Sequence, residues 1–200
     1  GPPVLALAPP GTSQLQDRYV QVKLVSRTAV THDVVMLRFA LPNSKQPLRL
    51  STMSCILVKG VAGSGVESTV RPYTPVSTNA LIGHFTLLVK VYPEGTMSRH
   101  LGSRSVGDSI LATHSSGNVK TQYPFGVGHV AMIAGGTGIT PMLQALQALL
   151  GNATDATKVT LLYSNRDQSD IIAKSTLDAW RARYASRFTI VYALTREPAD

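Results

Sequence analysis

The 200-residue sequence is 44% hydrophobic and 15% charged, which is the composition of an ordinary globular chain with enough apolar residues for a core. Its formal charge of +8 favours an acidic partner, but the basic residues are scattered singly, so nucleic-acid binding is not expected. One cysteine excludes a disulfide framework and a cysteine-based zinc or iron-sulfur site. The five histidines lack paired spacing, so no metal is predicted.

The first residues are rich in proline, and residues 1–17 are predicted to be a linker or a remnant of an expression sequence. Between Tyr19 and about Ala112, short alternating or β-branched runs are separated by turn residues, as in residues 19–25, 34–39 and 84–92. This spacing indicates an antiparallel sheet that closes into a barrel or sandwich. Residues 18–120 are therefore predicted to form a β domain.

The pattern changes after a connection rich in Gly, Ser and Pro, and residues 127–200 are predicted to form an α/β domain. Three apolar strands alternate with two helices, at residues 130–134, 159–163 and 188–194 for the strands and 140–151 and 169–184 for the helices. Continuous apolar strands predict parallel pairing with helices on both faces. Because such nucleotide-binding sheets carry five or six strands, this domain is expected to be incomplete at its C-terminus.

The sharpest local motif runs from Gly135 to Pro141, between an apolar strand and a helix in which Thr140 is predicted as the N-cap and Pro141 as the first residue. The glycines allow a ligand to approach the backbone, and the free N–H groups of a helix start suit a pyrophosphate. The motif is not GxGxxG, so it predicts a dinucleotide site of another kind. The alternative is a tight turn without a ligand.

Two further motifs lie in the β domain. In the segment from Arg71 to Ser77, Arg71 can pair with a phosphate, Tyr73 can stack on an aromatic ligand and Thr74 can form a hydrogen bond with a ring nitrogen. The segment from Gly95 to Leu101 predicts a short helix whose first N–H groups face an anion. Taken singly, the first segment is equally compatible with an ordinary strand edge, and the second is more often only a helix start.

In their order along the chain, the three motifs together resemble the ferredoxin-NADP reductase superfamily, and within it the cytochrome b5 reductase branch. The likeness rests on residues 71–75, 88–92, 95–98 and 132–142 and extends more weakly from Tyr19 to the end. The resemblance implies a six-stranded antiparallel FAD-binding barrel, then a nicotinamide-binding α/β domain, with the flavin between them. It also implies a terminal Cys-Gly-Pro segment and aromatic region, which this sequence lacks.

The resemblance implies a role for each motif. Arg71 would hold the FAD phosphates, Tyr73 would pack on the flavin, and Thr74 would lie near flavin N5. Lys90 and Tyr92 would line the flavin, and Thr140 would touch it from the second domain. The catalytic candidates are Thr74 and Lys90, and the residues expected to bind cofactors are Arg71, Pro72, Tyr73, Thr74, Leu88, Lys90, Tyr92, Gly95, Thr96, Met97, Ser98, Thr140, Gly135, Gly136 and Thr137.

The implied reaction passes a hydride from NADH to FAD and then electrons to a one-electron acceptor, for which an acidic haem protein such as cytochrome b5 suits the basic charge. NADPH stays open because Arg166 follows the second strand, and Thr195 and Arg196 follow the third, where relatives that use NADH carry an acidic residue. The resemblance implies the cytoplasmic face of the endoplasmic reticulum or the mitochondrial membrane, reached through a segment absent from this chain. The alternatives are the reductase portion of a nitrate reductase or oxygenase system and a flavin-binding module without turnover.

Overall fold

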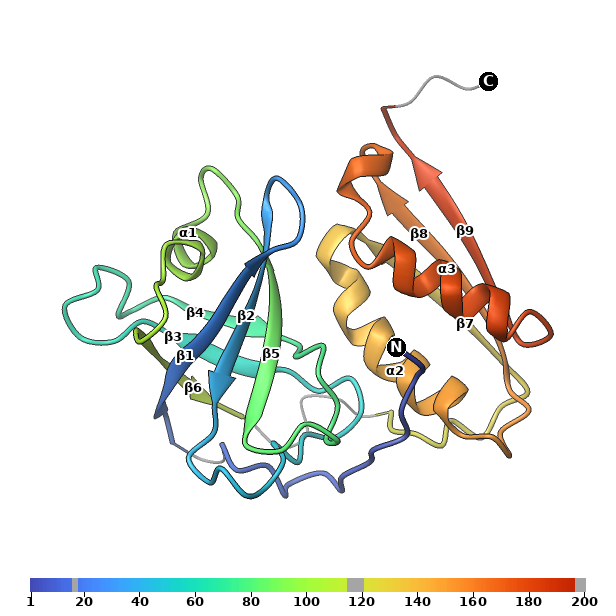
Figure 1. Cartoon of the computed structure of the whole chain (residues 1–200), viewed down its shortest axis with the longest axis horizontal. Helices are drawn as coiled ribbons and strands as arrows, with labels where there is room; N and C mark the ends of the chain where they lie inside the picture. Colours follow the sequence, from blue (N-terminus) through green and yellow to red (C-terminus); the bar gives the residue numbers. More distant parts are fainter. Residues whose placement is uncertain (16–17, 115–120, 197–200) are drawn as a thin grey trace.

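The computed structural model describes residues 1–15, 18–114 and 121–196, and it divides them into two parts that lie side by side (Figure 1). We call residues 20–114 the β half and residues 129–196 the α/β half. The β half contains β1 Val20–Ala29, β2 Val34–Ala40, β3 Ile56–Lys59, β4 Val70–Tyr73, β5 His84–Lys90, α1 Thr96–Gly102 and β6 Ser109–Thr113. The α/β half contains β7 His129–Gly135, the 3-10 turn η1 Gly136–Gly138, α2 Ile139–Gly151, β8 Lys158–Asn165, the 3-10 turn η2 Gln168–Asp170, α3 Lys174–Arg183 and β9 Phe188–Leu194.

The six strands of the β half form one antiparallel sheet in the order β4-β3-β6-β1-β2-β5. Side chains alternate between the two faces of a strand, so every second residue turns into the core. On β2 the buried residues Leu37 and Phe39 flank the exposed Arg38. Phe39 stacks on Phe85 of β5 with ring centroids 5.4 Å apart, which joins neighbouring strands inside this core.

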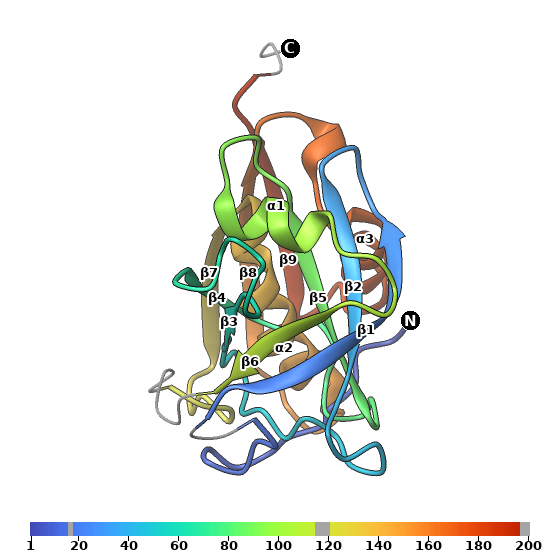
Figure 2. The same cartoon turned by 90° about the vertical axis from the view of Figure 1, so that its left-hand side faces the viewer.

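The sheet bends into a barrel-like form, as predicted, because β1 pairs with two different strands along its length. The first residues of β1 pair with β6 and its later residues pair with β2, and the register shifts between Leu24 and Ser26. Such a bulge increases the local twist and bend of a strand. In the described residues no strand ladder joins β4 to β5, so the sheet is barrel-like without full closure. Figure 2 shows α1 lying across the β strands.

The α/β half is a parallel sheet in the order β7-β8-β9, as predicted, but its helices cover one face only. Alternate strand residues such as Met132, Leu161 and Ile190 are buried against α2 and α3. The residues between them point to the other face, where the exposed fraction is 76% for Ile133 and 49% for Val191. In the described part of the chain, the prediction of helices on both faces is therefore wrong.

Both predicted helices differ from the structure at their beginnings. The N-cap of α2 is Gly138, and Thr140 lies inside the first turn, where its hydroxyl donates to the Thr137 carbonyl at 3.1 Å. The predicted helix over 169–184 is split into η2 and α3. Ala173 adopts a left-handed backbone conformation with φ +59° between them, which a continuous right-handed helix does not allow.

The two halves meet along α2. Val34 of β2 and Leu88 of β5 are buried within the core of the α/β half. Gln144 of α2 donates to the carbonyl oxygens of Pro75 (2.6 Å) and Ser77 (2.8 Å). The apolar contact and these two hydrogen bonds fix α2 against the wall of the β half.

The N-terminal residues, expected to be a linker or remnant, run along both halves. The Trp180 indole donates to the Gly1 carbonyl at 2.9 Å, and the Asn79 amide donates to the Ala6 carbonyl at 3.0 Å. The described residues include no helix that combines the length and the apolar character needed to cross a bilayer.

Candidate functional site

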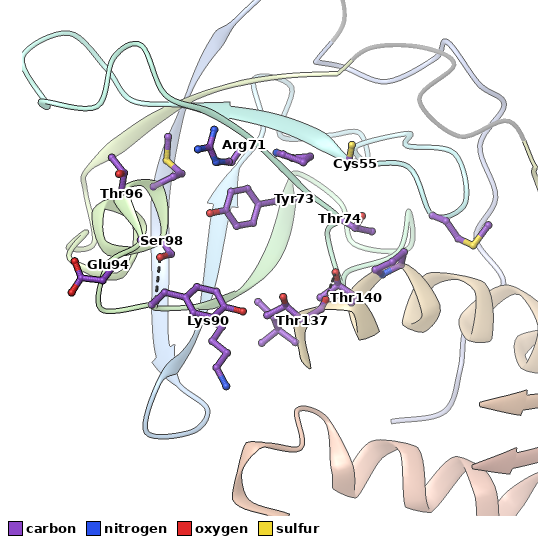
Figure 3. A pocket seen from close by; sticks show the side chains of 18 residues that line it. Cys55, Arg71, Tyr73, Thr74, Lys90, Glu94, Thr96, Ser98, Thr137 and Thr140 are labelled. Atoms are coloured by element: carbon purple, nitrogen blue, oxygen red, sulfur yellow. Dashed lines mark hydrogen bonds between the residues drawn. The ribbon is translucent and has the colours of Figure 1, made fainter. Parts of the chain in front are cut away.

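A cavity of about 710 Å³ opens where the two halves meet (Figure 3). This volume is within the range of pockets that hold organic cofactors. Residues of β4, β5, α1, η1 and α2 line it, so segments about 70 residues apart in the sequence face one space. The lining residues are Met53, Cys55, Arg71, Pro72, Tyr73, Thr74, Leu88, Lys90, Tyr92, Glu94, Gly95, Thr96, Met97, Ser98, Thr137, Gly138, Thr140 and Pro141.

The end of β4 supplies the first group of side chains. Arg71 and Tyr73 are two residues apart on a strand, so they lie on the same face. The Arg71 guanidinium is exposed and donates to the Val70 carbonyl at 2.8 Å, which leaves other N–H groups of its planar fork for a ligand. Burial raises the pKa of Tyr73 to about 12, so its ring is neutral and suited to packing on an aromatic group.

The turn into α1 supplies the second group. The Gly95 N–H donates to the Tyr92 carbonyl at 3.0 Å, and the Ser98 hydroxyl accepts from the Tyr92 N–H at 3.2 Å. A Cβ atom on Gly95 would collide with the Ser98 hydroxyl, so this tight turn requires glycine. The first turn of α1 carries no acidic residue. Its backbone N–H groups therefore make a local environment that suits an anion.

The η1 turn supplies the third group. Gly136 has φ +49°, and its carbonyl accepts a hydrogen bond of 3.0 Å from the buried Tyr163 hydroxyl. A Cβ atom added at Gly135, Gly136 or Gly138 would meet nothing within 4 Å, so the turn is open on its outer side. Open backbone at a strand-to-helix turn fits the close approach of a dinucleotide. Thr137, Gly138 and Thr140 line the cavity, whereas Gly135 and Gly136 lie outside it.

Lys90 lines the cavity near its end, but its ammonium group is already ion-paired. Lys90 Nζ lies 3.0 Å from Asp33 Oδ2 and 3.3 Å from Asp170 Oδ1. Burial alone would lower the pKa of Lys90, but the two carboxylates outweigh this effect and raise its pKa above the ordinary value. Figure 3 shows the Lys90 side chain extending away from Tyr73. Lys90 is therefore a permanent cation that joins the two halves.

The cavity contains thirteen of the fifteen residues predicted to bind cofactors, since Gly135 and Gly136 are the two outside it. Sequence reasoning missed five lining residues, which are Met53, Cys55, Glu94, Gly138 and Pro141. Gly138 and Pro141 belong to the recognised Gly135 to Pro141 motif, so the sequence could have indicated them. Met53 and Cys55 follow a stretch without a motif, so only the folded chain brings them to the site.

The chemistry of the lining favours holding a cofactor over catalysis by side chains. No histidine is among the described residues that line the cavity, and burial raises the pKa of the Cys55 thiol, so it stays protonated at neutral pH. A cation at Arg71, a neutral aromatic ring at Tyr73 and backbone N–H groups at α1 match a phosphate-bearing aromatic cofactor. The residues therefore fit a flavin dinucleotide.

Two family models match the chain. The model described as an oxidoreductase FAD-binding domain matches residues 21–121, and the model described as an oxidoreductase NAD-binding domain matches residues 132–200. The chain therefore belongs to the family of FAD- and NAD-binding oxidoreductases, as the resemblance in its motifs predicts.

Among curated proteins, the chain is similar to proteins named NADH-cytochrome b5 reductase 1. The protein from Meyerozyma guilliermondii is 40% identical over 184 residues, covering 92% of this chain and 64% of that protein. The Arabidopsis thaliana protein is 38% identical over 182 residues, covering 91% and 64%. This chain thus spans a little less than two thirds of the length of these relatives.

Among solved structures, the chain is similar to the cytochrome b5 reductase domain of Ulva prolifera nitrate reductase. The two share 30% identity with a TM-score of 0.77, and the match covers 90% of this chain and 75% of that one. This agreement supports the assigned fold as well as the family.

Proposed function

We propose that this protein passes a hydride from NADH to FAD and then electrons to a one-electron acceptor. The observation that carries the proposal is the single cavity in which the β4, α1 and η1 motifs meet. FAD supplies the redox chemistry when bound, accepting a hydride and releasing electrons singly. The chain itself binds, orients and shields the reacting groups.

The β half would hold the flavin. Arg71 and the N–H groups of residues 96–98 would bind the pyrophosphate, because both offer donors to an anion, while Gly95 shapes the turn through its bond to the Tyr92 carbonyl. The neutral Tyr73 ring would pack on the isoalloxazine, with Thr74 near N5. Leu88 and Tyr92 would complete the wall, and Lys90 would place its alkyl chain there while its ammonium faces Asp33. Thr74 and Lys90 remain the proposed catalytic residues.

The α/β half would present the nicotinamide. Gly135, Gly136 and Thr137 would face the dinucleotide, since the glycine backbone is open on its outer side. Thr140 would touch the flavin from α2, because it lines the same cavity as Tyr73. The Thr140 hydroxyl is tied to the Thr137 carbonyl at 3.1 Å, which would hold the contact in place.

The ion pairs of Arg166 support NADH over NADPH. Its guanidinium donates to Asp170 through Nε at 2.9 Å and through Nη2 at 3.4 Å. A 2′-phosphate would have to draw this group away from a buried carboxylate, which opposes NADPH binding. Arg196 is exposed, and its backbone N–H donates to the Arg166 carbonyl at 2.8 Å, so together with Thr195 it keeps NADPH as the second candidate.

Cytochrome b5 is the proposed acceptor, because the curated relatives carry its name and the charge of +8 suits an acidic haem protein. The second candidate is the reductase portion of a nitrate reductase, favoured by the likeness to the Ulva prolifera domain.

An anaerobic titration of the FAD-loaded protein with NADH and then NADPH tests the reaction. Bleaching of the flavin absorbance by NADH supports the proposal, and the concentration needed for each nucleotide ranks the two. Flavin that binds but stays oxidised would establish a flavin-binding module without turnover. A protein that binds no flavin would refute the proposal.

The matched variant for the cofactor site is Arg71→Gln, and its control is Arg38→Gln, an exposed arginine of the same half outside the cavity. Loss of a charged hydrogen bond predicts an FAD affinity about ten- to hundredfold lower for Arg71→Gln and no change for the control. Equal FAD affinity in the two variants would remove Arg71 from the proposed site.

A further inference from the structure

Two ion pairs face each other at the junction of the two halves. In the β half, Lys90 at the end of β5 pairs with Asp33 in the β1–β2 turn, with Nζ and Oδ2 3.0 Å apart. In the α/β half, Arg166 after β8 pairs with Asp170 of η2, with Nε and Oδ2 2.9 Å apart. Each half thus carries a neutral pair of its own.

The two pairs are oriented head to tail, so opposite charges also meet across the junction. Lys90 Nζ lies 3.3 Å from Asp170 Oδ1, and Arg166 Nη2 lies 3.7 Å from Asp33 Oδ2. The exposed fraction is 2% for Asp170 and 9% for Lys90, so the Lys90 to Asp170 contact is shielded from water. Shielding strengthens Coulomb attraction, so this contact is worth more than a surface ion pair.

The arrangement pairs each of the four charges within its own half. If the halves moved apart, Lys90 would keep Asp33 and Arg166 would keep Asp170, so no charge would lose all its partners. When the halves are docked, the two contacts across the junction are added to the pairs within each half. A single buried pair lacks this property, because its rupture leaves bare charges.

The same cluster does not carry a metal proposal. His32, Asp33 and Asp170 place one ligand atom each within 4.8 Å of the others. The two carboxylates already contact the side-chain cations of Lys90 and Arg166, which a divalent ion would have to displace. The cluster is therefore an ionic junction between halves.

We propose that Asp170 is a positioning residue for hydride transfer, acting through Lys90 with Asp33 as the matching carboxylate. The proposal rests on the proposed function. Lys90 and Leu88 both line the cavity on β5, and Leu88 also packs in the core of the α/β half. Holding Lys90 to η2 therefore fixes the flavin wall relative to the η1 turn, and with it the distance between the two cofactors. A displacement of about 1 Å between the reacting groups is enough to lower the rate of hydride transfer about a hundredfold.

The first experiment needs no cofactor activity. Amide hydrogen exchange of the full chain is measured for wild type, Asp170→Asn and Asp33→Asn, which is the less buried variant, and for the control Asp178→Asn. The control also loses ion pairs, to Lys174 and Arg181, but only within α3. In Asp170→Asn and Asp33→Asn, we expect amide exchange about three- to tenfold faster than in wild type on both sides of the junction, near residues 30–34 and 166–172. Unchanged exchange in the β1–β2 turn of both junction variants would refute the proposal.

The second experiment uses the FAD-loaded protein and single-turnover reduction by saturating NADH. We expect flavin reduction about tenfold slower or more in Asp170→Asn, FAD affinity unchanged and partial rescue by Asp170→Glu. High salt should change the wild-type rate little, because the Lys90 to Asp170 contact is shielded from water and is screened less than a surface ion pair. A variant that reduces flavin at the wild-type rate, or loses only FAD affinity, overturns the positioning role. A wild type that is never reduced refutes the proposed function, and the exchange measurement then decides the junction separately.

Discussion

The two halves of the molecule differ in how completely they cover their own cores. The β half encloses buried residues such as Phe39, Phe85 and Ile110 within one bent sheet. The α/β half buries one face of its sheet and draws Val34 and Leu88 of the β half into its core. Parallel sheets normally have both faces covered. The β half is thus the more independent unit, and the α/β half depends on its neighbour.

The largest expected effect comes from breaking the core of the β half. Phe39→Ala removes a fully buried ring that stacks on Phe85, and a cost of about 3–5 kcal/mol in unfolding free energy is expected together with loss of FAD binding. The comparison variant is Leu146→Ala in α2, also fully buried, with an expected cost of about 2–5 kcal/mol. Urea unfolding measures the stability of each variant, and flavin fluorescence measures its FAD binding. If Leu146→Ala removes flavin binding as thoroughly as Phe39→Ala, the β half is not independent.

The ionic junction predicts a dependence of stability on pH. Arg166 and then Lys90 hold the pKa of Asp170 below its ordinary value, although burial opposes this shift, and His32 lies 3.8 Å away. A carboxyl group with a lowered pKa stabilises the fold above its unfolded pKa and loses that contribution as pH falls through the folded pKa. At neutral pH, the free energy of unfolding of the wild type should exceed that of Asp170→Asn by about 1–3 kcal/mol.

This difference should begin to shrink below about pH 4, because the ordinary pKa of an aspartate is about 3.9. Urea unfolding of the two proteins between neutral pH and pH 3 measures it. A difference that grows as the pH falls would contradict the assigned sign.

A smaller effect is expected at the η1 turn. Tyr163→Phe removes the hydroxyl that donates to the Gly136 carbonyl at 3.0 Å and leaves the buried ring in place. The expected cost is about 1 kcal/mol, with weaker nicotinamide binding and unchanged FAD binding. Calorimetric titration with NADH and FAD separates the two. Tyr192→Phe is the control, because its hydroxyl bonds to Asp178, away from the turn. Equal loss of NADH affinity in both variants would argue against a role for the turn.

Much of the fold is readable from the sequence because the patterns are local. Alternation identified strands such as β2 and β5, and the glycine motif marked the junction of β7 and α2. The left-handed Ala173 was missed, since alanine gives no local signal for φ +59°, and the helix pattern runs through it. The uncovered sheet face was missed because an apolar strand does not reveal which of its faces finds a partner.

The candidate site was predicted through its motifs, and the cavity that joins them is a property of the fold. Arg71, Gly95 and Thr137 were each recognised in a short segment, and the structure brings them to one cavity. The pairing of Lys90 with Asp170 had no such signal, because the partners are separated by 80 residues. Ion pairs across a junction follow from how the halves dock, which local patterns do not encode.

The smallest expected effect lies on the uncovered face of β7 and tests the other side of the comparison. Ile133 is 76% exposed, whereas Met132 beside it is 5% exposed and packs against the helices. Ile133→Ser should change the unfolding free energy of this chain by less than about 0.5 kcal/mol. Met132→Ser should cost about 2–5 kcal/mol, as for other large buried residues. A cost above about 1 kcal/mol for Ile133→Ser, measured by urea unfolding, would mean that this face is covered in solution. The two halves would then be alike in enclosing their own cores, and the contrast between them would fail.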